Sequence, residues 1–347
     1  MRPLFEAYPT LGDALPCVEL AELPTPVMPF GESGRGWIKR DDLTHPLYGG
    51  NKIRKLEFIV GEWRAKNVRE VITFGAIGTN AGLATALAGH LEGINCRVLL
   101  FDQPVSATVR ANLGAMRQLG ARLDYCGSLF RTVLTYYLHP KRLLPGHYFL
   151  FAGCANPAAT FAYINAAFEL REQIRQGQLP EPTEIIVPVG SSSTLAGLSL
   201  GVQLCGLKTR VIGVRVAPSH LGPFPACTTG TVFTQIRAAH AFLKKHLPHM
   251  TFPEPGQPEL RDDYYGPGYG EPTPEALAAI ERFMASTGLA LEQTYSGKAA
   301  ACFLDRLEAA SGPVLFWNTF NSRPMSGLPT AAATYPLSPV LAGILAA

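Results

Sequence analysis

Lys52 stands where a lysine side chain could act on a ligand as well as carry a charge. It closely follows Gly49 and Gly50, and apolar residues at helical spacing over 53–60 predict a helix that begins beside it. Glycines let a ligand approach the backbone, and a helix N-terminus favours anions. Taken alone, a lysine in such a place is typical of a solvated charge. Its chemistry therefore depends on a second feature.

That feature is a hydroxyl-rich turn about 140 positions downstream, between a predicted strand (184–190) and a predicted helix. A helix cap needs one hydroxyl, so four in succession exceed what a cap requires. Backbone N–H groups and hydroxyls at a helix N-terminus could hold a phosphate dianion. An amine for an aldehyde and a separate phosphate cradle are what pyridoxal phosphate needs. The turn consists of Gly190, Ser191, Ser192, Ser193 and Thr194.

Alternating strand and helix patterns position these residues. Short apolar runs rich in β-branched residues alternate with helical patterns in both halves of the chain, which predicts an α/β fold with mostly parallel sheets. The 347 residues suggest about two domains. The segments 218–231 and 248–272 are rich in loop residues and predict a surface loop or lid. Predicted strands are 68–74, 96–102, 184–190, 209–216 and 313–318, and predicted helices are 80–93, 107–120, 157–175, 194–206, 273–287 and 297–311.

Composition narrows the classes of function. Hydrophobic residues make up 47% of the chain and charged residues 16%, which is typical of a folded protein. The net charge of +3 is scattered, so nucleic acid is not an expected partner. No apolar stretch is long enough for a membrane span. The seven cysteines contain no CxxC, and the eight histidines contain no HExxH, so we expect reduced thiols, a cytoplasmic location and no metal site.

The segment KRDDLTHPLYGGNKIRKLEF (39–58) resembles the KRDD…GGNKxRKLE signature of the D-cysteine desulfhydrase and 1-aminocyclopropane-1-carboxylate (ACC) deaminase family. These are fold type II pyridoxal phosphate enzymes, similar to the tryptophan synthase β-chain. The resemblance continues in the same order over about 300 residues. It is carried by LPTPV (23–27), GAIGTN (75–80), PVGSSSTLAGL (188–198), GYGEPT (268–273), TYSGKA (294–299) and FWNT (316–319).

The resemblance implies a role for each matching position. Lys52 would be the Schiff-base lysine, and Lys55 a second cation near the phosphate beside Gly190 to Thr194. Thr79 would contact the substrate carboxylate, and Asn80 would hydrogen-bond the 3-oxygen of the cofactor ring. Two tyrosines and a threonine complete the set: Tyr295 beside the ring, Tyr269 across the substrate, and Thr319 facing the pyridine nitrogen.

Three departures from the family pattern affect what this site can do. Thr79-Asn80-Ala81 replaces Ser-Asn-Gln or Ser-Asn-His, which removes one polar substrate contact. Ser296 stands where ACC deaminases have a glutamate, and a glutamate at the ring nitrogen would strengthen the electron sink that ring opening of ACC needs. Ser296 therefore argues against ACC as substrate. Asn318-Thr319-Phe320-Asn321 replaces HTGG and places bulk where glycines are usual.

The expected activity is a pyridoxal phosphate-dependent α,β-elimination on a small amino acid. Lys52 takes the α-proton as general base, and the products are a 2-oxo acid and ammonia. A β-replacement synthase shares the early steps, so the sequence leaves both open, together with an ACC deaminase-like reaction. A cofactor-binding homologue that has lost turnover is a further alternative. A nicotinamide reductase fits poorly, because the glycines at 75, 78 and 82 do not have GxGxxG spacing.

The resemblance also implies the domain arrangement. A large cofactor domain is expected from residues 1–56 and 170–347, with a smaller inserted domain at 57–169 and the site in the cleft between them. Family members are generally homodimers, and we expect the same here. The expected ligand is a small amino-acid substrate, with neither nucleic acid nor a membrane as partner.

Overall fold

The computed structural model describes residues 2–222 and 224–346, so Met1, Pro223 and Ala347 lie outside the described chain. The chain divides into two compact units. The first comprises the chain up to Phe58 together with Pro157–Arg323, and the second comprises Ile59–Asn156 together with the chain from Pro324 onward. Helix α3 (Asn51–Ala65) begins in the first unit and ends in the second.

This division differs from the expected one in two places. The expected boundary at 169/170 would cut helix α7 (Pro157–Arg175), whereas the whole helix packs in the first unit. The C-terminal segment belongs with the second unit, where Gln118 Nε2 donates to the carbonyl of Leu328 (2.7 Å) and Arg110 Nε to that of Ile344 (3.2 Å).

A six-stranded sheet forms the centre of the first unit, in the order β1-β2-β12-β7-β8-β11. Only β1 is antiparallel to its neighbour, so the carboxyl ends of β2, β12 and β7 meet at one edge. Ligand-binding loops of open parallel sheets gather at such an edge. The strands are β1 (Val27–Phe30), β2 (Gly36–Arg40), β7 (Glu184–Val189), β8 (Arg210–Arg215), β11 (Glu259–Arg261) and β12 (Val314–Asn318).

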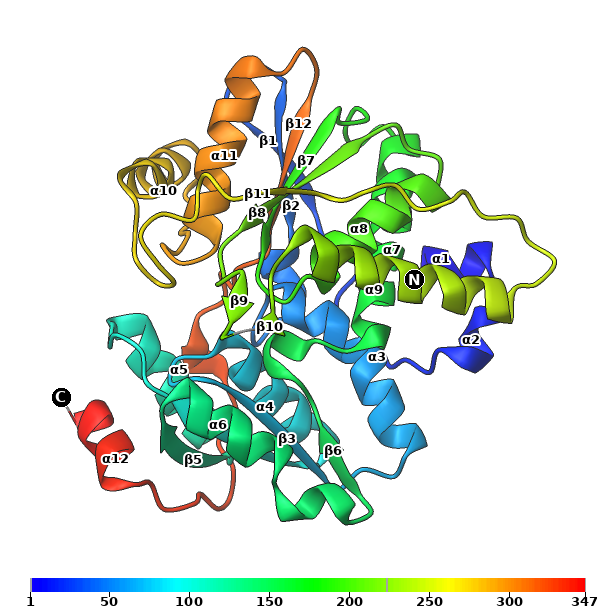
Figure 1. The fold of residues 1–347 in the computed structure, drawn as a ribbon. Helices are drawn as coiled ribbons and strands as arrows, with labels where there is room; N and C mark the ends of the chain where they lie inside the picture. The colour runs from blue at the N-terminus through cyan, green and yellow to red at the C-terminus, as the bar shows by residue number, and fades with distance from the viewer. Residues whose placement is uncertain (1, 223, 347) are drawn as a thin grey trace. The chain divides into compact units, whose positions relative to one another are not determined.

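Helices cover both faces of this sheet. Figure 1 shows α7, α8 and α9 on one side and α10 and α11 on the other, and a separate apolar cluster fills each side. The predicted loop 218–231 holds a small hairpin and the start of α9, a helix that the sequence patterns did not predict. The further elements are α1 (Pro3–Ala7), α2 (Leu11–Ala14), η1 (Asp41–Leu43), α8 (Ser193–Leu204), β9 (His220–Leu221), β10 (Phe224–Pro225), α9 (Thr229–His246), α10 (Pro274–Thr287) and α11 (Ser296–Ala309).

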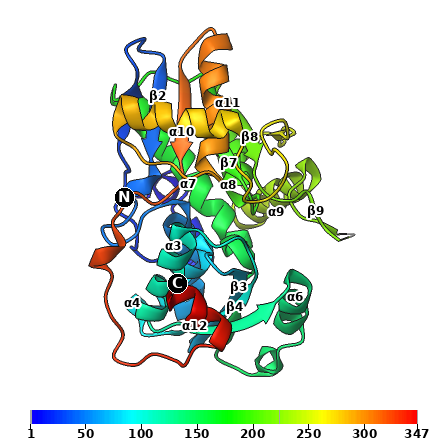
Figure 2. The same cartoon turned by 90° about the vertical axis from the view of Figure 1, so that its left-hand side faces the viewer.

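The second unit contains a parallel four-stranded sheet in the order β5-β4-β3-β6. Figure 2 shows α4 and α6 on opposite sides of this sheet. The strands are β3 (Glu70–Ala76), β4 (Asn95–Phe101), β5 (Arg122–Gly127) and β6 (His147–Phe149). The helices are α4 (Asn80–Glu92), α5 (Ala107–Gln118), α6 (Leu129–Tyr137), η2 (Pro140–Leu143), η3 (Ala152–Cys154), η4 (Met325–Gly327) and α12 (Pro339–Ala346).

The predicted α/β class with mostly parallel sheets is confirmed. Each predicted strand and helix corresponds to an element of the structure, with bounds that differ by a few residues. Within 2–222 and 224–346, no helix is both long enough and apolar enough to cross a membrane.

Candidate functional site

The turn that leads into α3 is held tightly against the end of β12. Gly50 has φ +100°, a conformation that favours glycine, and a Cβ added there would lie 2.9 Å from the carbonyl oxygen of Thr319. Gly50 N donates to the carbonyl of Asp41 (2.7 Å), and Asn51 N donates to that of Thr319 (3.1 Å). These bonds fix the first turn of α3, and with it the backbone of Lys52, at the carboxyl edge of the sheet.

Lys52 and Lys55 lie in the first two turns of α3 and have different surroundings. Lys52 is partly buried, and its Nζ donates to Oδ1 of Asn51 (2.7 Å). Lys55 is buried, with 1% of its surface exposed, and its Nζ lies 3.3 Å from Oγ of Ser191. The structure therefore brings a cation of α3 to the hydroxyl-rich turn.

The hydroxyl-rich turn links β7 to α8. Ser192 has a positive φ (+67°), which is uncommon for a residue with a side chain, and Ser193 begins α8. Ser193 Oγ is fully buried and has no hydrogen-bond partner among the described residues. A buried hydroxyl without a partner costs free energy unless a ligand supplies one. Asn51 Nδ2 also reaches Oγ1 of Thr194 (3.4 Å), so both ends of the turn face α3.

This turn fits a phosphate group. It combines an unsatisfied buried hydroxyl, the N-terminus of a helix of 12 residues and the ammonium of Lys55. Gly190 leaves room for an aromatic ring, since a Cβ there would lie 3.3 Å from Cε1 of Tyr295. The same turn therefore borders the residue that the resemblance places beside the cofactor ring.

Tyr269 and Tyr295 form a close pair in the first unit. Their hydroxyl oxygens lie 2.6 Å apart, and the two rings meet edge to face. Burial raises the pKa of each phenol, so both are protonated near neutral pH and one hydroxyl donates to the other. Tyr295 is also held by its backbone, because its N–H donates to Oε1 of Glu292 (2.6 Å). Sequence reasoning did not single out Glu292.

The turn after β12 departs from the family's HTGG pattern but has clear local partners. Asn321 Oδ1 accepts from the backbone N–H groups of Gly49 (2.7 Å) and Arg323 (2.9 Å). Asn318 is fully buried, and its Nδ2 finds no hydrogen-bond partner in the part of the chain that the structure describes. Thr319 is largely buried and offers its carbonyl to α3. Its predicted position at the pyridine nitrogen stays a prediction.

Thr79 and Asn80 belong to the second unit, and both have partners there. Thr79 caps α4, accepting a hydrogen bond from the N–H of Gly82 (3.1 Å). Asn80 Oδ1 accepts from Nδ2 of Asn112 (2.9 Å), which also donates to the carbonyl of Gly78 (2.8 Å). Their expected contacts with substrate and cofactor stay predictions.

A buried charge network that the sequence did not reveal lies behind α3. Arg54 binds Asp41 and Glu169, with the shortest N–O distances at 2.7 and 2.8 Å, and Lys39 Nζ lies 2.5 Å from Oε1 of Glu169. Asp41 also accepts from the indole of Trp317 (2.7 Å). The network therefore ties α3, which carries Lys52, to the loop after β2 and to β12, which Thr319 directly follows.

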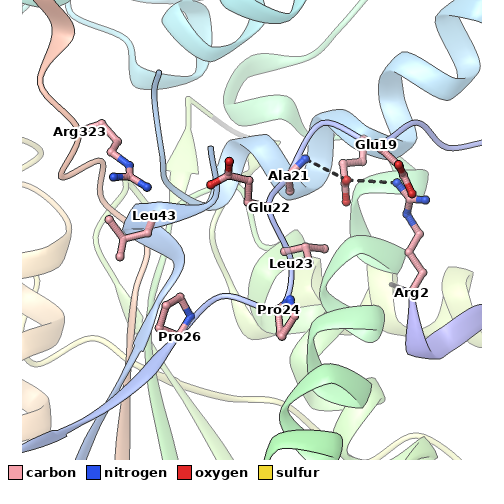
Figure 3. Close-up of a pocket in the computed structure, with 10 residues that line it drawn as sticks. Arg2, Glu19, Ala21, Glu22, Leu23, Pro24, Pro26, Leu43 and Arg323 are labelled. Carbon is pink, nitrogen blue, oxygen red and sulfur yellow. Dashed lines mark hydrogen bonds and ion pairs between the residues drawn. The ribbon is translucent and has the colours of Figure 1, made fainter. Parts of the chain in front are cut away.

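A pocket of about 540 Å³ opens elsewhere on the first unit. Figure 3 shows the guanidinium group of Arg323 directed toward the carboxylate of Glu22 across it. Glu57 accepts from Arg2 (3.2 Å) and from the N–H of Ala21 (3.0 Å) at its other end. The predicted cofactor-binding side chains are not among the described residues that line this pocket.

Comparisons with known proteins identify the family to which the chain is similar. A family model described as "Pyridoxal-phosphate dependent enzyme" matches residues 18–319. D-cysteine desulfhydrase of Serratia proteamaculans (strain 568) is 29% identical over 314 residues, which cover 86% of this chain and 88% of that protein. Nocardicin C-9' epimerase of Nocardia uniformis subsp. tsuyamanensis is 31% identical over 328 residues, covering 89% and 94%.

Solved structures place the fold in the same group. The crystal structure of an ACC deaminase homologue has a TM-score of 0.77 and 28% identity, and the match covers 92% of this chain and 95% of that one. The processed form of threonine deaminase isoform 2 from Solanum lycopersicum has a TM-score of 0.62 over 92% of this chain and 91% of the other, at 18% identity, which supports the fold alone. The fold is thus that of fold type II enzymes, and the resemblance seen in the sequence is confirmed. The chain belongs to the family of pyridoxal phosphate-dependent enzymes, and pyridoxal 5'-phosphate is its cofactor.

Proposed function

We propose that this enzyme is a lyase that acts on a small amino acid by α,β-elimination, in the manner of a D-cysteine desulfhydrase. The observation that carries the proposal is that Asn51 and Lys55, which flank Lys52 on α3, both contact the hydroxyl-rich turn before α8 within one unit. The relatives named D-cysteine desulfhydrase, at 29% identity over most of the chain, support it.

The candidate site residues of the first unit each have a role in this proposal. Lys52 would hold the aldehyde of the cofactor, and Lys55 with Ser191 to Thr194 would hold its phosphate. When bound, pyridoxal phosphate supplies an electron sink for the charge left at the α-carbon. The Lys52 amine takes the α-proton as general base. The Tyr269–Tyr295 pair holds a proton at its shared hydroxyls, which a departing β-substituent such as sulfide can accept.

Ser296 supports elimination over ACC ring opening. Its Oγ accepts from the N–H of Glu292 (2.8 Å) and donates back to the carbonyl of the same residue (3.2 Å). A neutral hydroxyl held in this way does not provide the anionic partner that would favour a protonated ring nitrogen. We therefore propose that cysteine-like amino acids are better substrates than ACC.

A second candidate reaction is epimerisation at the α-carbon. The relative named Nocardicin C-9' epimerase, at 31% identity, favours it. An epimerase needs one group to remove the proton and another to return it on the opposite face. Lys52 and the tyrosine pair are two such groups. Elimination and epimerisation would then differ only in whether the β-substituent leaves before the proton returns.

We propose a cytoplasmic location and a homodimeric state as well. The seven cysteines are free thiols, which supports a reducing compartment. The homodimer rests on the family resemblance alone, and sedimentation of the purified protein tests it.

One experiment separates these reactions. Purified enzyme is given D- and L-cysteine, β-chloroalanine, D-serine and ACC in D₂O. Pyruvate and 2-oxobutyrate are followed together with deuterium in the recovered amino acid. Elimination predicts pyruvate from cysteine or β-chloroalanine. Epimerisation predicts deuterated amino acid of inverted configuration without keto acid, and a β-replacement synthase predicts turnover only with an added nucleophile.

Lys52→Arg tests the proposed amine. We expect a loss of at least about a thousandfold in keto-acid formation and no borohydride-stable pyridoxyl adduct at position 52 by mass spectrometry. Lys66→Ala, just after the end of the same helix and solvent-exposed, is the matched control and should leave both unchanged. An adduct on another lysine of the native enzyme would refute the assignment. A stable adduct with no turnover of any amino acid would instead indicate a homologue that has lost activity.

A further inference from the structure

Lys298 is a buried cation in an unfavourable place. It is the third residue of α11, its side chain is fully buried, and the positive end of the helix dipole lies beside it. Its Nζ donates to the carbonyl oxygens of Tyr265 (2.6 Å) and Gly268 (3.2 Å). A neutral side chain would avoid the cost of burying this charge. The two hydrogen bonds to carbonyl oxygens offset part of this cost, and we ask what structural role they have.

These contacts fall on one short loop, residues 265–270, which carries Tyr269. Gly266 and Gly270 within the loop have positive φ values of +71° and +82°. Glycine at these positions gives the backbone freedom that other residues lack. A loop of this composition needs outside contacts to hold one conformation. Lys298 supplies contacts to two of its carbonyls.

The same turn of α11 carries the partner of Tyr269. Tyr295 immediately precedes the helix, three residues before Lys298, so the two side chains leave on the same side. The hydroxyls of Tyr295 and Tyr269 lie 2.6 Å apart. Lys298 therefore joins the loop of one tyrosine to the helix that positions the other. A link of this kind can set the spacing of the two hydroxyls through the loop backbone.

A second cation secures the start of the loop. The guanidinium carbon of Arg215, at the end of β8, lies 4.2 Å from the centre of the Tyr265 ring, and its Nε lies 2.5 Å from Oδ1 of Asp262. Arg215 thus anchors Tyr265 from the sheet, while Lys298 holds the part of the loop closer to Tyr269. Lys298 also lies near the face of the Tyr265 ring (5.1 Å), so both cations share this aromatic side chain.

We propose that Lys298 is a positioning residue that holds loop 265–270 so that the hydroxyl of Tyr269 meets that of Tyr295. The role of the tyrosine pair in catalysis rests on the proposed function, whereas the positioning of the loop does not. Lys298 acts through these carbonyls and touches neither substrate nor cofactor in this proposal.

Hydrogen–deuterium exchange of the holoenzyme tests the positioning without any substrate. In Lys298→Met, which keeps the length of the side chain and removes the donors, exchange of peptides covering 262–272 should rise about tenfold or more. Lys298→Gln keeps an amide NH₂ donor group on a shorter side chain and should show a smaller rise, and it serves if the Met variant does not fold. Lys244→Met, an exposed lysine paired with Glu254, is the control and should leave this region unchanged. Unchanged exchange of 262–272 in a folded Lys298 variant overturns the proposal.

A double-mutant cycle tests the link to the tyrosine. Once a substrate is found, Lys298→Met should lower kcat about tenfold with little change in the affinity for pyridoxal phosphate. In the background of Tyr269→Phe, the same change should have almost no further effect, because the hydroxyl that it positions is already gone. Additive losses would contradict the proposal. Failure to find any substrate would count against the proposed function, while the exchange result on Lys298 would still stand.

Discussion

Two glutamates on opposite faces of the large sheet, Glu169 buried and Glu292 half-buried, are held in different ways. Glu169, in α7, is bound by the cations of Lys39 and Arg54, and also accepts from the N–H of Thr25 (3.0 Å). Burial opposes ionisation of Glu169, but Arg54 and Lys39 outweigh it and lower its pKa to about 2. Glu292, before α11, has no cation on its carboxylate within 4 Å among the described residues, and burial raises its pKa.

At Glu292, backbone amides do not offset the effect of burial on the pKa as Arg54 and Lys39 do at Glu169. The carboxylate of Glu292 accepts from the N–H groups of Thr294 (2.8 Å), Tyr295 (2.6 Å) and Ser296 (2.7 Å), yet the net shift is upward. Paired opposite charges make a rigid support whose partners depend on each other. A carboxylate held by amides instead fixes one local turn, here the one that carries Tyr295. We therefore expect substitutions in the ion pairs around Glu169 to lower the stability of the whole first unit. Substitutions at Glu292 should mainly affect the site that contains Tyr295.

The largest effect is expected from Arg54→Met. Removal of the guanidinium leaves the carboxylates of Asp41 and Glu169 without their main partner in a fully buried position. We expect a loss of about 3–5 kcal/mol in the free energy of unfolding, measured by urea denaturation of the holoenzyme.

Arg64→Met is the control for this change because it removes the same side chain from the same helix. Arg64 pairs with Glu92 but is 61% exposed, so its loss should cost at most about 1 kcal/mol. Equal losses in the two variants would show that burial does not distinguish these pairs.

The next largest effect is the dependence of the free energy of unfolding on pH in acid. The pKa of Glu169 in the fold, about 2, lies below the ordinary value of 4.5, so the unfolded chain binds the proton first as pH falls. Its contribution is present above pH 4.5 and is lost as pH falls toward 2, on the order of 3 kcal/mol in all. Relative to native enzyme, Glu169→Gln should therefore be least stable near neutral pH, with a deficit that shrinks below pH 4.5. Urea denaturation between pH 3 and 7 measures this, and a deficit independent of pH would contradict it.

Glu292→Gln should show a smaller loss with the opposite dependence on pH. The amide retains one acceptor, so at least one of the three backbone donors loses its partner, at a cost of about 1–3 kcal/mol. Because burial raises the pKa of Glu292, the native protein binds this proton before the unfolded chain does. Native stability from this group therefore declines as pH rises above 4.5, and the deficit of the variant should shrink in the same direction. The same urea series measures it. A deficit that grows with pH, as for Glu169→Gln, would remove the distinction between the two glutamates.

Local patterns predicted the elements that carry the site, but not the contacts between them. The spacing after Lys52 predicted α3, and the run before Gly190 predicted β7, because apolar periodicity and helix caps are short-range signals. The predicted helix 157–175 coincides with α7 (Pro157–Arg175). Nothing in its periodicity indicates that Glu169 faces Arg54, a residue 115 positions away.

Residue type alone could not distinguish some roles. Lys298 lies within a motif that carries the resemblance, yet its contacts with two backbone carbonyls depend on the conformation of a distant loop. Asn321 replaces a family glycine, and only the fold shows that its amide accepts from Gly49. Thr79 is similar, because a hydroxyl before a helix looks the same whether it caps the helix or contacts a substrate.

The smallest effect is expected at Thr79, where a substitution tests whether the hydroxyl caps the helix or contacts a substrate. Thr79 can also be compared with Glu292, because its side chain accepts from a backbone amide without a charge. Thr79 also satisfies an amide at the start of a helix, but with a hydroxyl that carries no charge. Thr79→Ala should lower the free energy of unfolding by about 1 kcal/mol, and this loss should not vary between pH 4 and 8 because no titrating group is removed. Thr79→Ser keeps the cap and should restore most of the stability. If activity falls in both variants by far more than stability does, Thr79 has a role in substrate binding beyond its cap. If stability is unchanged in Thr79→Ala, the hydrogen bond from the N–H of Gly82 contributes nothing to stability. A backbone N–H at a helix start would then be stabilised only by a charged acceptor such as the carboxylate of Glu292.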